Sequence, residues 1–164
     1  MTQGTLKVGD LVSKIDAGEI RLPEIQRAYV WKGPQVAQLV DSLYRRYPSG
    51  SLLLWEADTD RAVAERPTAI VPTPGAVGPW KPLYLLDGQQ RLTSLYQSTS
   101  TRSAVLTQTA KNRPVRLHFY FDIRAALDPN VARRDSIVPV PEDRIIRENF
   151  GRDVVLDIST EEAE

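Results

Sequence analysis

Two helices are predicted in the first third of the chain by the spacing of its apolar residues. Apolar side chains recur every three or four positions between Gly33 and Tyr47, and Gly50 ends this element. The residues on that face are Val36, Leu39, Val40, Leu43, Tyr44 and Tyr47. A shorter helix is predicted over about residues 10–17, with Asp10 as its N-cap and Gly18 as its stop signal.

Strands are predicted where short apolar runs or strict alternation replace the helical spacing. Residues 19–22 form a brief extended segment, Ser51–Ala57 a buried strand and Lys81–Leu86 a second core strand. Val115–Ile123 alternates apolar with polar residues, which indicates a strand with one wet face. Farther along the chain, only Val154–Ile158 resembles a strand.

The length of 164 residues and the apolar content of 41% suffice for one domain with a core, but hardly for two. We therefore predict a single domain over residues 1–164, with its core over about residues 8–124. Residues 58–80 are predicted as a long loop, 125–150 as short helices or an arm, and 159–164 as a frayed tail. The chain is expected to be a piece of a longer protein.

Composition and charge exclude several classes of function. With no cysteine and one histidine, the chain lacks disulfides, a cysteine nucleophile and the usual histidine-rich metal sites. Its 21 basic residues balance 21 acidic ones, so net charge alone predicts no strong binding to nucleic acid or acidic lipid. Because the sequence shows neither a signal peptide nor an apolar run of membrane-spanning length, we expect a soluble, cytoplasmic protein without a membrane partner.

The segment LLDGQQRLTS, Leu85–Ser94, gathers polar groups at a predicted strand-to-helix turn. Asp87 and Gly88 form a sharp turn before a helix predicted over Gln89–Gln97. The free N–H groups of a helix start favour an anion, Gly88 permits close approach, and Arg91 could chelate a phosphate. Hydroxyl groups could come from Thr93 or Ser94.

Two interpretations of this turn remain open on residue types alone. In the first, Asp87 orients a water molecule or holds a magnesium ion whose other ligands are phosphate and water. In the second, the turn is an ordinary N-cap, and Gln89 and Gln90 are solvated helix residues. The P-loop motif G-x-x-x-x-G-K-[ST] occurs nowhere in the sequence, so a nucleotide would not bind through a P-loop.

A second polar cluster precedes the longer helix. Gln26 and Arg27 stand beside Tyr29 and Trp31, and arginine with an aromatic shelf can hold a base or a phosphate. The alternative is that the two aromatic residues pack in the core against the following helix. Residues 81–116 also carry six basic residues against one acidic residue, which is typical of a solvated face or of a surface for a phosphate-rich ligand.

Two motifs, in this order, resemble the N-terminal domain family of the GmrSD modification-dependent restriction endonucleases, within the ParB/sulfiredoxin-like superfamily. The motif Q-R-x-Y-x-W is present as Gln26, Arg27, Tyr29 and Trp31, and the motif D-G-Q-Q-R as Asp87 to Arg91. With the elements between them they cover about residues 8–57 and 82–97. SspE-like phosphorothioate-sensing defence proteins share this architecture.

The resemblance implies an α+β fold, with a small mixed sheet flanked by helices, and a D-G-Q-Q-R turn that supports nucleotide binding and hydrolysis with Mg²⁺. The residues carried over to catalysis are Asp87, Gln89, Gln90 and Arg91. The candidate nucleotide-binding residues are Gln26, Arg27, Gly88, Thr93 and Ser94. Tyr29 and Trp31 become candidates for packing or for contact with a DNA modification.

Three hypotheses on function follow. The first is a nucleotide-binding, NTP-hydrolysing regulatory domain of a modification-dependent restriction or phage-defence protein. The second is a non-catalytic module that senses DNA or a DNA modification, and the third is a partner-binding scaffold. The expected partners are a nucleoside triphosphate, modified DNA and a nuclease, either as a C-terminal domain or as a separate subunit; self-association is left open. With one histidine and no H-N-H constellation, this chain is not expected to cut DNA alone.

Overall fold

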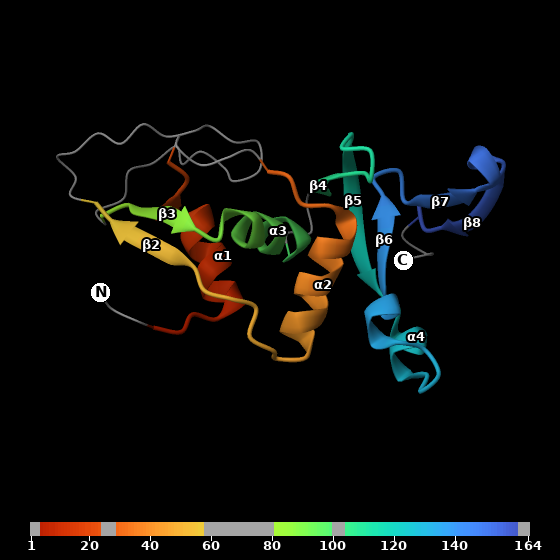
Figure 1. The fold of residues 1–164 in the computed structure, drawn as a ribbon, viewed down its shortest axis with the longest axis horizontal. Coiled ribbons are helices and arrows are strands. Elements are labelled where there is room, and N and C mark those ends of the chain that lie inside the picture. The colour runs from red at the N-terminus through yellow and green to blue at the C-terminus, as the bar shows by residue number, and fades with distance from the viewer. Residues whose placement is uncertain (1–3, 24–28, 58–80, 100–103, 161–164) are drawn as a thin grey trace. The chain divides into compact units, whose positions relative to one another are not determined.

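A computed structural model describes residues 4–23, 29–57, 81–99 and 104–160 (Figure 1). The chain divides into two compact units, each built from two separate stretches of sequence. Unit 1 comprises Met1–Tyr29 and Gly50–Tyr96, and unit 2 comprises Val30–Ser49 and Gln97–Glu164. The prediction of a single domain over the whole chain stays a prediction.

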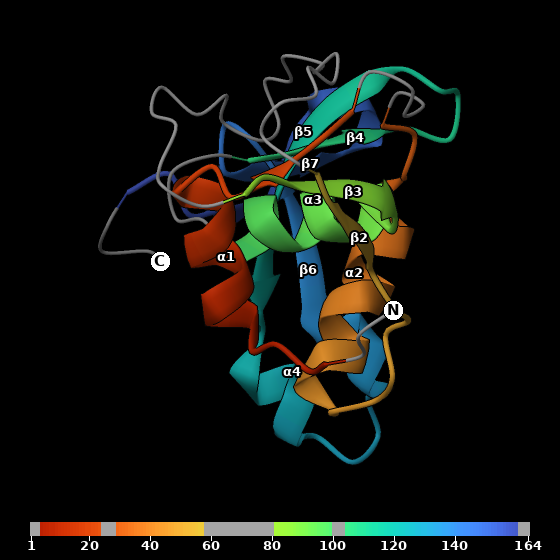
Figure 2. The same cartoon turned by 90° about the vertical axis from the view of Figure 1, so that its left-hand side faces the viewer.

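Unit 1 contains a small mixed sheet of three strands, β1 (Ile20–Arg21), β2 (Leu53–Glu56) and β3 (Leu83–Asp87). The strand order is β1-β3-β2, with β1 parallel and β2 antiparallel to the central strand β3. Helices α1 (Val8–Asp16) and α3 (Gln89–Thr99) lie beside each other next to this sheet (Figure 2). This arrangement confirms the α+β fold class, with a mixed sheet and flanking helices.

The core of unit 1 forms where α1, β1, β3 and α3 bring their apolar side chains together. Its buried members are Leu11, Ile15, Ile20, Leu22, Leu85 and Leu92. Leu54 of β2 and Leu52, just before that strand, are partly buried and pack against this cluster, as do Leu95 and Tyr96 of α3. Because β3 runs through the middle of the sheet and leads directly into α3, the turn between them is anchored to the core on both sides.

Unit 2 contains helix α2 (Gly33–Tyr44) and two antiparallel sheets. The first sheet has the order β4-β5-β6, with bounds Val105–Gln108, Pro114–Phe121 and Ile137–Pro141. The second is the hairpin of β7 (Ile145–Glu148) and β8 (Asp153–Asp157). The short helices are α4 (Ile123–Leu127) and the 3₁₀ turns η1 (Arg133–Ser136) and η2 (Asn149–Gly151). Helix α2 packs on β6 and η1.

Both predicted N-terminal helices are confirmed, with corrections at their ends. Helix α1 begins at Val8 with Lys7 at its N-cap, so the prediction of Asp10 as N-cap is wrong; its carboxylate lies in the first turn instead. Gly18 follows the helix at a positive φ of 74°, as a stop residue should. Helix α2 ends at Tyr44, before the predicted Tyr47, since Arg46 takes a left-handed φ of 58° that helical backbone does not allow.

The strand predictions hold better for the centre of each sheet than for its edges. The stretch Ser51–Ala57 is not the buried strand we predicted: β2 is an edge strand whose Leu53 and Trp55 are 39% and 41% exposed. The alternating strand is confirmed as β5, which ends at Phe121 because Asp122 caps the following helix α4. The predicted C-terminal strand is confirmed as β8.

Strands β4, β6 and β7 were not predicted from the sequence. Strand β6 contains Pro139 and Pro141, which the chain tolerates because β6 is an edge strand with one neighbour. The segment EDRIIRENF, for which helix was one prediction, forms β7 and the turn η2. The predicted loop over residues 58–80 lies outside the described residues. In the part of the chain that the structure describes, no helix is both long and apolar enough to cross a membrane.

Candidate functional site

The turn between β3 and α3 is built around a glycine that no other residue could replace without strain. Strand β3 ends at Asp87, Gly88 has a positive φ of 94°, and α3 begins at Gln89. A Cβ atom on Gly88 would lie 2.4 Å from Cδ2 of Leu52 and 3.3 Å from the carbonyl oxygen of Ser51. The turn therefore requires glycine both for its conformation and for its close approach to the segment before β2.

The N-terminus of α3 offers backbone donors at this turn. The first intrahelical hydrogen bond runs from the N–H of Leu92 to the carbonyl oxygen of Gly88, at 2.9 Å. In an α-helix the N–H groups of the first turn, which precede this bond, have no acceptor within the helix. Together with the positive end of the helix dipole, they favour an anion at this position.

Arg91 and Asp87 place one positive and one negative charge at the turn. Nη2 of Arg91 lies 3.5 Å from Oδ2 of Asp87 and donates a hydrogen bond of 2.6 Å to the carbonyl oxygen of Ser51. The Arg91 side chain is 30% exposed, whereas that of Asp87 is 75% exposed. The carboxylate therefore faces solvent while the guanidinium is partly enclosed by the protein.

Gln89 and Gln90 are both buried, each only 6% exposed, so the interpretation of these residues as solvated helix positions is wrong. They turn inward because α3 follows β3 so closely that its first turn packs into unit 1. Among the described residues, Oε1 of Gln89 has no hydrogen-bond partner. A buried amide oxygen without a partner costs about 1–3 kcal/mol, so a ligand or a water molecule that donates to Oε1 would be stabilised at this turn.

The two hydroxyl residues of the same helix also face inward. Thr93 and Ser94 are fully buried, and Oγ of Ser94 donates to the carbonyl oxygen of Gln90 at 2.7 Å. The hydroxyl of Tyr29 lies 2.7 Å from the same Oγ. Because the single proton of Ser94 is given to Gln90, Tyr29 must be the donor in this pair.

Tyr29 is thus a buried residue of unit 1 that joins the first motif to the second. Burial raises the pKa of its hydroxyl to about 12. Tyr29 is therefore buried, as the packing alternative predicts, but its hydrogen bond is to α3 and not to the helix that follows it in the sequence, α2. Gln26 and Arg27, the other unit 1 residues of that motif, lie outside the described residues.

Comparison with known proteins identifies the chain's family. Residues 8–154 match the family model of the GmrSD restriction endonuclease N-terminal domain. The chain belongs to this family. It is also similar to an uncharacterized protein of Methanocaldococcus jannaschii, with 28% identity over 138 residues that cover 80% of this chain and 22% of that protein. The GmrSD N-terminal domain family match extends over both units, whereas the chain spans about a fifth of the length of the curated relative.

Few side chains near the turn of this GmrSD N-terminal family domain could coordinate a metal ion. Within the described ranges, no three histidine, aspartate or glutamate side chains come together in a group that could hold one. Asp87 is a single exposed carboxylate beside an arginine. Mg²⁺ takes one or two carboxylates and completes its shell with phosphate oxygens and water, so this donor set fits magnesium that arrives with a triphosphate.

Trp31 belongs to unit 2 and is half-buried there. Its carbonyl oxygen accepts a hydrogen bond of 3.0 Å from the N–H of Gln108, next to a parallel bridge between Lys32 and Gln108. The backbone of Trp31 therefore ties the start of α2 to strand β4. The structure assigns Tyr29 and Trp31 to different units, although only one residue separates them in the sequence.

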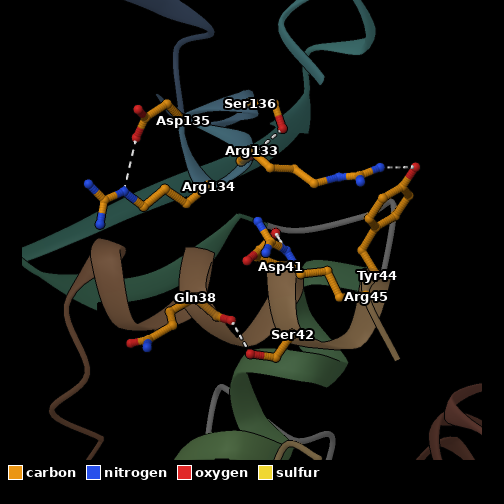
Figure 3. Close-up of polar contacts among 9 residues, drawn as sticks. All are labelled: Gln38, Asp41, Ser42, Tyr44, Arg45, Arg133, Arg134, Asp135 and Ser136. Atoms are coloured by element: carbon orange, nitrogen blue, oxygen red, sulfur yellow. Dashed lines mark hydrogen bonds and ion pairs between the residues drawn. The ribbon is translucent and has the colours of Figure 1, made fainter. Parts of the chain in front are cut away.

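Unit 2 of the GmrSD N-terminal family domain carries a polar and aromatic cluster that the sequence did not predict (Figure 3). Arg133 stacks on the ring of Tyr44, with Cζ 4.6 Å from the ring centroid, and its Nη2 donates to the tyrosine hydroxyl at 3.0 Å. The ring of Phe121 lies 4.8 Å from that of Tyr44. Tyr44 is 52% exposed despite both contacts. The helical spacing placed Tyr44 on the buried face of α2, and no local signal linked it to Phe121 and Arg133, which lie 77 and 89 positions away.

Proposed function

We propose that this GmrSD N-terminal family domain binds a nucleoside triphosphate at the β3–α3 turn and hydrolyses it, as the regulatory part of a modification-dependent restriction or phage-defence protein. The observation that carries the proposal is the amide oxygen of Gln89, which has no hydrogen-bond partner among the described residues and is buried in the first turn of a helix whose N–H groups favour an anion. Family membership supports the restriction context.

Each residue of the turn has a role in this proposal. The N–H groups at the start of α3 and the charge of Arg91 hold the phosphates, with Gly88 allowing the backbone to approach them. Asp87 faces solvent, where it can orient the attacking water or bind a magnesium ion carried by the triphosphate. Gln89 or Gln90 positions the water through a side-chain amide, as glutamines do in other NTPases. When bound, Mg²⁺ would neutralise charge on the phosphate oxygens.

The hydroxyl residues Thr93 and Ser94 are proposed to stabilise the turn. Ser94 is fully buried and its proton is given to Gln90, so we propose that it fixes the first turn of α3 rather than contacting phosphate. Thr93 is equally buried. Gln26 and Arg27 are proposed to add phosphate contacts, as the family resemblance implies.

The decisive experiment is phosphate release from each of the four NTPs with Mg²⁺, with and without duplex DNA. The chain would be compared with Asp87→Ala and with Asp10→Ala, a control that removes an exposed carboxylate from the first turn of α1. We expect turnover in the wild type and the control but not in Asp87→Ala. Equal turnover in Asp87→Ala would refute the site assignment.

The remainder of the activity is proposed to lie outside this chain. The curated relative is several times longer than the matched region, so there is room in such proteins for further domains. We propose that a nuclease, either as a C-terminal domain or as a separate subunit, cuts the modified DNA. The domain described here would supply the nucleotide-dependent control of that step.

A second candidate function, binding of DNA without catalysis, is favoured by the exposed Tyr44 and Arg133 pair of unit 2. Aromatic rings with an arginine are common contacts for nucleic-acid bases and backbone. This function predicts DNA binding that weakens steeply with salt, survives Asp87→Ala and is reduced in Arg133→Ala. Filter-binding or anisotropy titrations at several salt concentrations measure it, and binding that is insensitive to Arg133→Ala excludes this surface.

A further inference from the structure

The guanidinium of Arg91 lies between two glycines that come from different parts of unit 1. Gly50 and Gly88 have positive φ angles of 92° and 94°. A Cβ atom on Gly50 would lie 3.2 Å from Cζ of Arg91 and 3.3 Å from Nε and from Nη1. A Cβ atom on Gly88 would lie 3.3 Å from Nη2. Both glycines therefore leave room that the guanidinium occupies.

The guanidinium of Arg91 is hydrogen-bonded to the main chain of the segment before β2. Nη2 donates to the carbonyl oxygen of Ser51 at 2.6 Å, a short distance that is typical of a charge-assisted hydrogen bond. Nε is buried and has no partner among the described residues. Nε is thus buried, while Nη2 is engaged with Ser51 and Asp87, so an outside anion would approach Arg91 from the Nη1 side.

The segment that Arg91 holds is also tied to the turn by the sheet. Residues Gly50–Leu52 lead directly into β2, whose first residue, Leu53, pairs with Asp87 at the end of β3. A register shift between Leu53 and Leu54 interrupts regular pairing at this point. The arginine therefore reinforces the place where the ladder between β2 and β3 is irregular.

We infer that Arg91 is a positioning residue, which fastens the Gly50–Leu52 segment to the β3–α3 turn through the carbonyl oxygen of Ser51 and thereby fixes the turn for its ligand. The fastening itself depends only on the geometry of unit 1; its consequence for the ligand rests on the proposed function. Lysine keeps the charge but lacks the planar fork, so it cannot replace the bond to Ser51 and also fill the space between the glycines.

Hydrogen exchange measured by mass spectrometry on the nucleotide-free chain tests the fastening. In Arg91→Lys we expect exchange in a peptide covering residues 49–53 to become roughly tenfold faster, because a hydrogen bond to a charged donor is lost. Gly50→Ala keeps the arginine but crowds its guanidinium, and we expect the same direction of change. Gly50→Ala also provides the test on its own if Arg91→Lys fails to fold.

Gly151→Ala is the matched control for the glycine substitution. Gly151 has a positive φ of 88°, close to that of Gly50, but a Cβ atom there would meet nothing within 4 Å. It carries comparable backbone strain without the crowding of Arg91, so the change in exchange of its own peptide, residues 149–153, measures strain alone, and the change over residues 49–53 in Gly50→Ala should exceed it. Unchanged exchange in both Arg91→Lys and Gly50→Ala would overturn the inference.

The consequence for the ligand is tested with MgATP as the probe. If Arg91 fixes the turn, Gly50→Ala should lower the rate of phosphate release at saturating MgATP about tenfold or more, with a smaller change in KM, while Gly151→Ala leaves both unchanged. Unchanged kinetics in Gly50→Ala, with faster exchange, would overturn the positioning role. If the wild type neither binds nor hydrolyses any NTP, the proposed function fails, and the exchange experiment still decides the fastening.

Discussion

Replacing Tyr29 by phenylalanine should destabilise the protein at neutral pH and stabilise it at high pH. The Tyr29 hydroxyl is buried and donates to Ser94, which in turn donates to the carbonyl oxygen of Gln90. Tyr29→Phe keeps the ring and its packing but removes this donor. The pair connects Tyr29 of the Q-R-x-Y-x-W motif to the first turns of α3, so its energy bears on how the two motifs are held together.

The size of the effect follows from two opposed contributions. A neutral hydrogen bond contributes about 1 kcal/mol to the free energy of unfolding, which the variant loses at pH 8. In the wild type, the pKa of Tyr29 is about 12 in the folded chain and 10.0 in the reference state. A raised folded pKa gives stability that is complete below pH 10 and is lost as the pH rises toward 12; at pH 11 the loss is about 1.4 kcal/mol. The two contributions cancel between pH 10 and pH 11, and by pH 11 the variant is the more stable.

The assay is denaturant-induced unfolding of wild type and Tyr29→Phe between pH 8 and pH 11.5. The difference in free energy of unfolding between the two proteins isolates Tyr29, because the lysines and the other tyrosines titrate in both. Tyr47→Phe is the matched control, since it removes the hydroxyl of an exposed tyrosine. A stability difference that stays constant from pH 8 to pH 11.5 would refute the assignment of Tyr29 as a buried donor.

A double-mutant cycle with Ser94→Ala measures the pair itself. Ser94→Ala leaves the buried Tyr29 hydroxyl without its acceptor, which costs about 1–3 kcal/mol. In the double variant no buried hydroxyl is left unpaired, so the two losses should not add, and we expect a coupling energy of about 1 kcal/mol at pH 8. Additive losses would show that the two hydroxyls do not interact in solution.

Three further predictions concern other parts of the chain. Gly88→Ala should lower the free energy of unfolding by about 2 kcal/mol or more, measured by chemical denaturation, since its Cβ atom would meet Leu52 at 2.4 Å and its φ is positive. Asp122→Ala removes the N-cap of α4 and should cost about 1 kcal/mol, detected as faster exchange of the α4 amides. The hydrogen bond from Arg147 lowers the pKa of Asp143 below its ordinary 3.8, so its contribution to stability is present above about pH 4 and lost as the pH falls further. Acid unfolding of Asp143→Asn should therefore depend less on pH below 4 than that of the wild type.

Local residue patterns were sufficient to predict the elements whose backbone has a regular period. The repeat of apolar residues fixed α2, and the alternation of residues fixed β5, because each pattern matches one period of the backbone. The order of strand, turn and helix at Asp87 to Arg91 could also be predicted from the local sequence, since Gly88 permits the positive φ that the turn requires. The order of the two motifs was enough to indicate the family that the comparison then showed.

The tertiary structure alone decided which polar residues are buried and what they contact. Gln89 and Gln90 have the composition of a solvated helix start, and only the packing of α3 on unit 1 places them inside. The contact of Arg91 with Ser51 joins residues 40 positions apart, and that of Tyr29 with Ser94 joins residues 65 apart. Burial and pairing at such separations depend on how strands and helices pack, which no local pattern of residue types encodes.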